Sequence, residues 1–591
     1  MRMKLLRVFL LGIAVLALTH LFAGGPERSS SDAKPPLKTQ LRRPVALVLT
    51  DDGKWLFVAN QRSGSITAID VNKNAIAEFP VGRKLADLAL TPDGRHLLAV
   101  DEVANELILL SRKDDKLRVV HRLAVGNAPV SVQVTQDGKE CFVASLWAHR
   151  LSVIEVGREA TKLRNTRTIP LPFAPRKQLL IKDTDKLIVA DSFGGRLAVV
   201  DVKKGTADSI RTLPAHNIRG LALSRDSKEL FVAHQVLRGE ARSIVDDIHW
   251  GNLMTNTLRV LPMASVLTPD ADLVKVSRLL ALGDVGKGAA DPAGLCVCPD
   301  GRLIVPIGGT GELTFGKEKE LDWVRLRVGQ GPTAVVATAN GGRAFVANKF
   351  ADSVSVVDLK EGRVKAEIAL GPQPELSRAD RGEILFHDAR LSHDGWLSCQ
   401  SCHTDGHTNG LLNDNLSDGS FGTPKRVLSL LGVKDTAPWA WNGGINDLKD
   451  QIRKSITLTM RGAKPSDEQV LDLEAYLQTL TPPPPVKRAG DGKEQETVER
   501  GQQVFNEQGC ASCHTPPTYT SKKAYDVGLA DQAGNTTFNP PSLRGVSQGG
   551  PYFHDNRAST LEDVFVRHRH QLKSELGEDE RADLLSFLRS L

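Results

Sequence analysis

A turn motif that recurs along the N-terminal part of the chain constrains the fold more than any other feature of the sequence. Each copy has an apolar strand, a turn of the Asp-Gly type, and a second strand rich in Phe, Val and Ala. Asp-Gly and Asn-Gly turns suit tight hairpins because these residues tolerate a positive φ. The intervals from Gly53 to Gly94 and from Gly94 to Gly138 are 41 and 44 residues. The copies occupy residues 51–53, 92–94, 136–138, 183–185, 225–227, 299–301 and 340–342.

Repeat units of this length, with four short strands each, are typical of β-propeller blades. The seven copies therefore predict a seven-bladed β-propeller over residues 41–372, although the copy at residues 183–185 departs from the common pattern and has no glycine. We expect the ring to close without a metal ion or a disulfide. The Phe-Val-Ala-Asn strand at residues 57–60 resembles the strands of the YVTN family of surface and periplasmic propellers.

The repeat is interrupted once, because 74 residues separate Ser227 from Gly301. The additional segment includes His249 and Trp250. A long insertion in a propeller usually emerges on one face and is often functional. The alternative is a surface loop that fills a groove against the next domain.

The N-terminus has the pattern of an export signal. Arg2, Lys4 and Arg7 precede an apolar stretch in which His20 is the only titratable side chain up to residue 26. A basic start followed by such a stretch predicts a signal peptide or an N-terminal anchor over residues 1–25, with a linker over residues 26–40. A buried N-terminal helix is the alternative. We therefore expect an exported chain, in the periplasm or at the cell surface, that contacts a membrane only if this segment is not cleaved.

Composition excludes several classes of protein. The chain has 591 residues, of which 25% are charged and 41% hydrophobic, so it is neither disordered nor a multi-span membrane protein. The net charge of +6 is small and the basic residues are scattered, which argues against nucleic-acid binding.

Four of the seven cysteines form two Cys-x-x-Cys-His motifs, which are the attachment signature of c-type haem. The motifs predict two covalently bound haem c groups, attached through Cys399 and Cys402 and through Cys510 and Cys513. The histidine that follows each pair, His403 or His514, becomes the proximal iron ligand. Half a zinc site and a redox dithiol are the alternatives, and the immediate histidine argues against both. No residue pattern supports a calcium ion, which is the only other cofactor that we consider.

The three remaining cysteines lie in the predicted propeller. Cys296 and Cys298 are two positions apart on a strand, so they point to opposite faces and cannot readily bridge each other. We expect these two residues and Cys141 to be small apolar core residues rather than metal ligands.

The two haem motifs have matching surroundings. Arg-Gly followed by Phe precedes each motif, at residues 381–386 and 500–505, and an acidic pair begins a closing helix after each one. Such pairs suit the positive end of a helix. The pattern predicts a duplicated, mainly helical cytochrome c unit, with domains over residues 373–485 and 486–591. A run of four prolines at residues 482–485 begins a stiff connection between them.

Residues 385–392, 437–443 and 551–555, together with the first haem motif, resemble bacterial di-haem cytochrome c peroxidases and the related methylamine-utilisation di-haem enzymes. The resemblance covers about 215 residues. It implies that Trp441 lies between the two haems as an electron relay, with ordinary interface packing as its other role. It also implies that Gln451 occupies the position of the active-site glutamine. The position of the family's catalytic glutamate falls at Met460 or Arg461, so that acid is missing here.

For the distal ligand of the first haem, the candidates are Met460, His407, His387, His393 and an open site. Met460 is the only methionine after residue 263, and it follows Trp441 through an apparently helical stretch over residues 448–459. We expect Met460 to be the ligand, with a core methionine as the alternative. His407 follows His403 too closely to reach the opposite face.

No methionine follows Met460, so a histidine is expected on the second iron, and the candidates are His554, His568 and His570. In the peroxidase family an axial methionine follows the matching histidine by fourteen positions, which points from His554 to His568. His570 is the alternate, but on a helix it would lie off that face.

Three functions are therefore open. The first is an exported di-haem electron-transfer protein with the propeller as a docking platform for a redox partner, such as a small cytochrome or another donor or acceptor. The second is a peroxidase-like oxidoreductase that reduces hydrogen peroxide or oxidises a bound substrate. The third is a cell-surface binding module with auxiliary haems. The missing acid favours the first over the second.

Overall fold

The computed structural model describes residues 37–157, 162–320, 322–486 and 492–591. The predicted signal or anchor segment and most of the linker that follows it lie outside the described residues. In the ranges that are described, no helix is long and apolar enough to cross a membrane.

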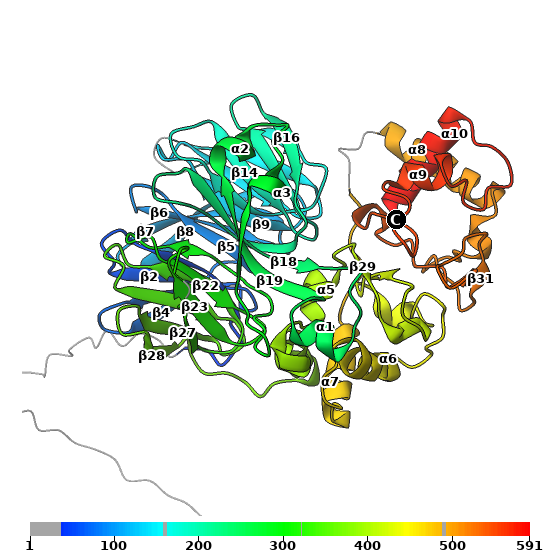
Figure 1. Ribbon diagram of the computed structural model, residues 1–591. Helices are drawn as coiled ribbons and strands as arrows, with labels where there is room; N and C mark the ends of the chain where they lie inside the picture. Colours follow the sequence, from blue (N-terminus) through cyan, green and yellow to red (C-terminus); the bar gives the residue numbers. More distant parts are fainter. Residues whose placement is uncertain (1–36, 158–161, 321, 487–491) are drawn as a thin grey trace, which may run out of the picture. The chain divides into compact units, whose positions relative to one another are not determined.

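The N-terminal part is a propeller of seven four-stranded antiparallel sheets (Figure 1), which confirms the predicted number of blades. In each blade the strands follow one another in chain order. The first three blades are β1 (Pro44–Leu49), β2 (Trp55–Asn60), β3 (Ser65–Asp70) and β4 (Ala75–Pro80); β5 (Leu85–Leu90), β6 (His96–Asp101), β7 (Glu106–Lys113) and β8 (Lys116–Ala124); and β9 (Pro129–Val134), β10 (Glu140–Ser145), β11 (Arg150–Val156) and β12 (Leu163–Pro170). The other four are β13 (Pro175–Leu180), β14 (Lys186–Asp191), β15 (Arg196–Asp201) and β16 (Thr206–Thr212); β17 (His216–Leu223), β18 (Glu229–Leu237), β19 (Met254–Pro262) and β20 (Arg278–Ala281); β21 (Cys296–Val297), β22 (Leu303–Ile307), β23 (Glu312–Gly316) and β24 (Val324–Arg327); and β25 (Pro332–Ala337), β26 (Arg343–Asn348), β27 (Ser353–Asp358) and β28 (Arg363–Ala369).

The repeated turn joins the first two strands of every blade. In the first blade Gly53 takes a φ of 66°, and the Thr50 hydroxyl donates to the Asp52 carboxylate at 2.5 Å. The same hydroxyl-to-acid contact recurs at 2.6 Å in the second blade and at 2.7 Å in the third. In the divergent copy at residues 183–185, Asp183 takes the positive φ, at 56°, so this hairpin forms without a glycine.

The ring is closed by contacts between its first and last blades. The backbone N–H groups of Arg42 and Arg43 both donate to the Asp352 carboxylate at 2.7 Å, and β1 packs against β25. Arg42 also pairs with Glu78 at 2.8 Å. No disulfide takes part, because all seven cysteines are unpaired in the structure. Cys141 and Cys298 are fully buried in blade cores and Cys296 packs beside Cys298, as expected for small apolar residues.

The insertion belongs to the fifth blade and packs against the next domain, as expected for a loop that fills a groove there. Its helices are α1 (Val245–His249), α2 (Met263–Leu267) and α3 (Leu273–Val276). Ile248, Leu253 and Met254 share a hydrophobic core with Trp396 of the following domain. The Trp396 ring lies directly over the backbone of Gly251 and Gly283, where a Cβ would meet it at 2.6 and 3.0 Å.

The C-terminal part is mainly helical, as predicted. Its first half has α4 (Arg378–Phe386), α5 (Cys399–Cys402), α6 (Leu448–Lys454), a π-helical turn (Ser455–Thr459) and α7 (Asp467–Leu477); its second half has α8 (Gly492–Glu507), α9 (Leu561–Val566) and α10 (Glu578–Ser590). Two-residue strands pair β29 (Leu412–Asn413) with β30 (Lys425–Arg426) and β31 (Tyr525–Asp526) with β32 (Thr537–Phe538). Single 3-10 turns complete it at Ala389–Leu391, His393–Gly395, Thr404–Gly406, Leu416–Asp418, Val433–Asp435, Cys510–Ser512 and Val546–Gln548.

The duplication inferred from the sequence is visible in how the helices cross. Helix α4 packs on α7, and α8 packs on α10. At each crossing a glycine, Gly382 or Gly501, lies so close to a carbonyl of the opposing helix that no Cβ would fit. The arginine before each glycine pairs with an aspartate of that helix at 2.7 Å, Asp472 in the first crossing and Asp583 in the second.

Candidate haem sites

Both Cys-x-x-Cys-His motifs line a single cavity of about 690 Å³, which lies between the two helical halves. Its wall contains all six attachment and proximal residues predicted from the sequence, namely Cys399, Cys402, His403, Cys510, Cys513 and His514. It also contains Met460, Gln451 and Trp441. The sequence therefore identified residues that the fold brings to one place.

The histidines that complete the two motifs are held in the same way. His403 Nδ1 lies 2.9 Å from the carbonyl oxygen of Leu428, and His514 Nδ1 lies 3.1 Å from that of Tyr519. A carbonyl can only accept, so Nδ1 carries the proton and Nε2 keeps its lone pair. Burial lowers the pKa of His403 to about 4, which keeps the ring neutral. A neutral imidazole whose other nitrogen donates to a fixed carbonyl is the usual form of an iron ligand.

The cavity fits haem c by the chemistry of its donors. Burial raises the pKa of Cys399 and of Cys402 to about 12, as expected for thiols in an apolar wall. In that wall a porphyrin would find aliphatic and aromatic side chains, two thiols, and one oriented imidazole at each attachment motif. No pair of cysteines is in a disulfide, so every thiol is available for attachment.

Met460 is buried, with 3% of its surface exposed, at the end of the π-helical turn that follows α6. The predicted helical stretch over residues 448–459 is therefore present. Met460 belongs to the hydrophobic core against which Cys399 and Cys402 pack. A π-helical turn widens the helix locally and is frequent at functional sites.

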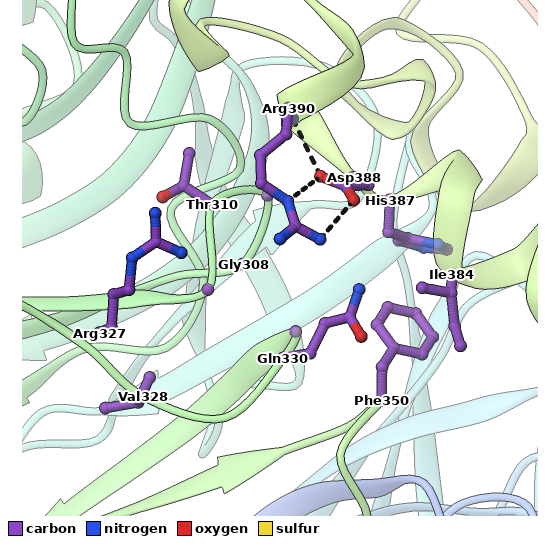
Figure 2. Close-up of a pocket in the computed structure, with 13 residues that line it drawn as sticks. Gly308, Thr310, Arg327, Val328, Gln330, Phe350, Ile384, His387, Asp388 and Arg390 are labelled. Carbon is purple, nitrogen blue, oxygen red and sulfur yellow. Dashed lines mark hydrogen bonds and ion pairs between the residues drawn. The ribbon is translucent and has the colours of Figure 1, made fainter. Parts of the chain in front are cut away.

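Of the histidines that competed with Met460, His407 also lies in the wall of the haem cavity, whereas His387 and His393 lie outside it. Both ring nitrogens of His407 are occupied, Nδ1 by the Ser429 hydroxyl at 2.9 Å and Nε2 by the Gln548 carbonyl at 3.1 Å. His387 lines a separate cavity of about 140 Å³ together with Phe350 and Arg390, and the Asp388 carboxylate accepts hydrogen bonds from Arg390 there (Figure 2). His393 lies at the contact with the propeller insertion. Met460 and His407 both combine burial with a place in the cavity wall, but both ring nitrogens of His407 are occupied by hydrogen bonds, which leaves Met460 as the better candidate.

Of the three candidates for the second iron, His554 and His570 line the cavity, which favours His570 over His568. His570 lines the cavity, and burial together with the neighbouring His514 lowers its pKa to about 4. His568 is not among the described residues that line it, and its Nε2 lies 3.2 Å from the Arg557 carbonyl. The helical spacing that set His570 aside does not apply here, because α9 ends at Val566 and the backbone turns left-handed at Arg569, with a φ of 44°.

Trp441 lies at the boundary between the two helical halves. Its Nε1 donates to the Arg426 carbonyl at 2.8 Å, and its own carbonyl accepts from the Asn539 N–H of the second half at 2.7 Å. Its ring meets His554 edge-on at 6.2 Å between centroids. His554 in turn stacks on Phe538 at 4.2 Å. A continuous aromatic contact therefore crosses the boundary inside the cavity wall.

The acid–base groups of the cavity are few. Gln451 donates to the Ser455 hydroxyl at 3.1 Å, while its buried Oε1 has no hydrogen-bond partner. The described residues of the wall include no glutamate, and their one carboxylate, Asp418, is paired with Lys425 at 3.1 Å. This agrees with the missing glutamate inferred from the sequence.

Comparisons with known proteins agree with this geometry. Residues 377–481 match the family described as di-haem cytochrome c peroxidase, residues 498–591 match cytochrome c, and residues 74–174 match the seven-bladed β-propeller lactonases. The chain is a seven-bladed propeller fused to a di-haem cytochrome c peroxidase-like region. The di-haem matches imply haem c as cofactor and support haem-based electron transfer or peroxidase-like activity.

Individual relatives are similar to between about one third and three fifths of this chain. The methylamine utilization protein MauG of Methylorubrum extorquens is 26% identical over 280 residues, which are 36% of this chain and 76% of that protein. The cytochrome c551 peroxidase of Nitrosomonas europaea is 28% identical over 270 residues, 36% of this chain and 79% of that protein. The hydrazine synthase subunit beta of Kuenenia stuttgartiensis is 24% identical over 386 residues, 60% of this chain and 97% of that protein.

The propeller holds the attachment loop of the first haem motif, which the sequence did not reveal. Asp291 accepts hydrogen bonds from the hydroxyls of Ser398 at 2.6 Å and Ser401 at 2.8 Å, on either side of Cys399. His216 Nε2 bonds to the Ser401 carbonyl at 3.0 Å. The first attachment loop of the di-haem region is therefore built against the propeller.

A charged cluster anchors the same loop just beyond His403. The Asp405 carboxylate accepts from Arg219 at 3.0 Å and also pairs with Arg176. Burial alone would raise the pKa of Asp405, but the two guanidinium groups outweigh it and hold the pKa well below its usual range. The only local signal of this role is the Asp-Gly pair at residues 405–406, which forms a left-handed turn.

Proposed function

We propose that the chain is an exported di-haem electron-transfer protein whose propeller both supports the first haem motif and offers a docking platform to a redox partner. The observation that carries the proposal is the single cavity shared by both attachment motifs, with Trp441 in its wall at the boundary between the halves. When bound, haem c supplies a one-electron iron couple. The residues of the chain attach, orient and shield it.

In this proposal Cys399, Cys402, Cys510 and Cys513 form the thioether links, and His403 and His514 are the proximal ligands. Met460 would be the second iron ligand in the first half, because it is buried in the wall and both ring nitrogens of the competing His407 are occupied by hydrogen bonds. His570 takes that role in the second half, in place of His568. A methionine ligand raises a haem potential relative to a second histidine, so the two halves would differ in potential.

The aromatic contact from Trp441 to His554 supports electron passage between the halves. It is fixed at both ends by backbone hydrogen bonds, from Trp441 to Arg426 and from the Arg426 N–H to the His554 carbonyl at 2.7 Å. A rigid, buried aromatic pair needs little rearrangement when charge passes.

Peroxidase-like chemistry is the second candidate, and one observation favours it. The buried Oε1 of Gln451 has no protein partner and lies in the cavity wall, where it could accept a hydrogen bond from a small substrate. Against it stands the lack of a free carboxylate in the described wall, because general acid–base assistance typically contributes about 10²–10⁴-fold to such a step.

The test is the rate of electron transfer between the two halves after rapid partial reduction of the haem-loaded protein. Trp441→Phe should slow this step. Trp439→Phe is the matched control, because its Nε1 also donates to a backbone carbonyl, at 3.2 Å, but within the first half alone. Equal rates in both variants would remove Trp441 from the path. Rapid turnover of hydrogen peroxide by the unmodified protein would favour the second candidate.

A further inference from the structure

Three potential metal ligands converge where the propeller insertion meets the di-haem region, away from the haem cavity. His249 ends α1 of the insertion, and His393 and Asp394 lie in the loop before the first attachment motif. His249 Nδ1 lies 2.7 Å from Asp394 Oδ2, and His393 Nε2 lies 3.2 Å from the same oxygen. The three donor atoms lie within 4.8 Å of one another.

The loop that carries two of these donors is held rigidly by the propeller. Asp394 adopts a left-handed conformation with a φ of 55°, and its carbonyl accepts from the Gly288 N–H at 2.7 Å. The next carbonyl, of Gly395, accepts from Ala290 at 3.3 Å, and Gly286 donates to the His249 carbonyl at 3.2 Å. One propeller segment, residues 286–290, therefore holds the backbone on both sides of the cluster, so the side chains meet without a change of fold.

The Asp394 carboxylate is not neutralised by a stronger cation. In the described part of the chain it makes no ion pair with lysine or arginine, and the side chains that contact it at ion-pair distance are the imidazoles of His249 and His393. All three side chains are partly exposed, His249 by 40%, His393 by 32% and Asp394 by 24%. A dissolved ion can therefore reach the cluster and keep water as a further ligand.

We propose that His249, His393 and Asp394 form a binding site for a divalent transition-metal ion of the zinc class, which clamps the insertion of the fifth blade to the di-haem region. Two imidazole nitrogens and one carboxylate oxygen, with water in the fourth position, make a four-coordinate set that zinc accepts. Bond lengths of about 2.0–2.2 Å place neighbouring donors roughly 3.3 Å apart. The observed 2.7 and 3.2 Å separations reach that spacing by small side-chain rotations.

The donor set also indicates which ions would not compete. Magnesium and calcium prefer all-oxygen sites, and copper(I) prefers sulfur ligands. Two imidazoles with a single carboxylate favour zinc and its first-row neighbours. Because neither His249 nor His393 lines the haem cavity in the described structure, this site is independent of the haem assignments.

The test is calorimetric titration of the haem-loaded full chain with Zn²⁺ after treatment with a chelator, combined with metal analysis of the dialysed protein. We expect one zinc ion per chain. His249→Ala and His393→Ala should each weaken binding by more than the roughly 10–100-fold that loss of a second-shell partner costs. His121→Ala, a histidine of the outer strand β8, is the matched control and should leave the affinity unchanged.

Asp394→Asn keeps the left-handed backbone accessible, since asparagine tolerates this conformation, and it removes only the charged donor. This variant should fold, as judged by an unchanged haem spectrum, and still bind zinc more weakly than the parent. Absence of saturable binding by the parent would overturn the proposal. Binding that is equally strong in both histidine variants would also overturn it, because the ion would then be held elsewhere. Magnesium should produce no heat of binding, and competition by magnesium at similar concentration would contradict the assigned ligand class.

Discussion

Removing the charge of Asp405 should weaken the attachment of the di-haem region to the propeller by about 3 kcal/mol. The side chains of Asp405, Arg176 and Arg219 are exposed by only 29%, 17% and 16%. Loss of one partner from a buried ion pair typically costs about 3–5 kcal/mol, because the remaining charges stay desolvated. Residual exposure places this cluster at the lower end of that range. Asp405→Asn preserves the shape of the side chain, so the decrease in the free energy of unfolding measures the effect of removing the charge.

The assay is denaturant unfolding of the haem-loaded protein, followed by circular dichroism of the backbone and of the haem absorption band. Two signals are needed because a chain of several domains need not unfold in one step. The control is Glu155→Gln, whose partner Arg164 is 74% exposed. Such surface pairs contribute at most about 1 kcal/mol. In a double-mutant cycle that combines Asp405→Asn with Arg219→Gln, the decreases in the free energy of unfolding should be non-additive. Equal losses in Asp405→Asn and Glu155→Gln, or an additive cycle, would refute the reasoning.

The pH dependence follows from the lowered pKa of Asp405. A carboxyl whose pKa is lower in the folded state than in the unfolded state, where it is about 3.9, stabilises fully above the unfolded value. The contribution is lost as the pH falls from there through the folded value. The difference between the parent and Asp405→Asn should therefore persist from pH 7 to pH 5 and shrink below about pH 4. A difference that vanished between pH 7 and pH 5 would contradict the assigned charge pair.

Three further predictions concern the haem sites and their frame. Denatured protein should retain two haems per chain in a pyridine haemochrome assay, and Cys513→Ala should weaken the attachment of one only; a parent with one haem or none would contradict this. His570→Ala should change the ferric electron paramagnetic resonance spectrum of one haem, whereas His568→Ala should leave it unchanged. The reverse pattern would support His568 as the iron ligand, as the family spacing of fourteen positions indicates. Gly382→Ala should destabilise the first helical half by about 1–3 kcal/mol or more in thermal unfolding, because the added Cβ overlaps a carbonyl of α7; an unchanged transition would show that the helices can separate freely.

The propeller was predictable because its determinants are local and repeated. Each blade carries its own turn residues, and the inner strands, such as Trp55–Asn60, are buried along almost their whole length between neighbouring sheets. The divergent turn at Asp183 could still be recognised as a blade turn because the flanking strands kept the repeat interval. The attachment motifs were equally readable, since five contiguous residues carry the whole signal.

What the sequence missed depends on residues far apart in the chain or on local backbone detail. Asp291 meets Ser398 across 107 residues, and His249 meets Asp394 across 145. No periodicity links such partners. The preference for His568 over His570 is a different case, because it set His570 aside by helical spacing, and the left-handed residue Arg569 ends that spacing.

The ferric near-infrared spectrum of the haem-loaded protein tests the central claim most directly, because it reports whether a thioether binds iron. We predict a weak sulfur-to-iron band in the parent and its loss in Met460→Ala, together with a new high-spin signal. Met460 is buried in the wall beside the first attachment motif, and the competing histidine of that wall, His407, has both ring nitrogens occupied by hydrogen bonds. A parent spectrum that lacks the band, or a Met460→Ala spectrum identical to that of the parent, would contradict the electron-transfer assignment and favour an open, peroxidase-like first site.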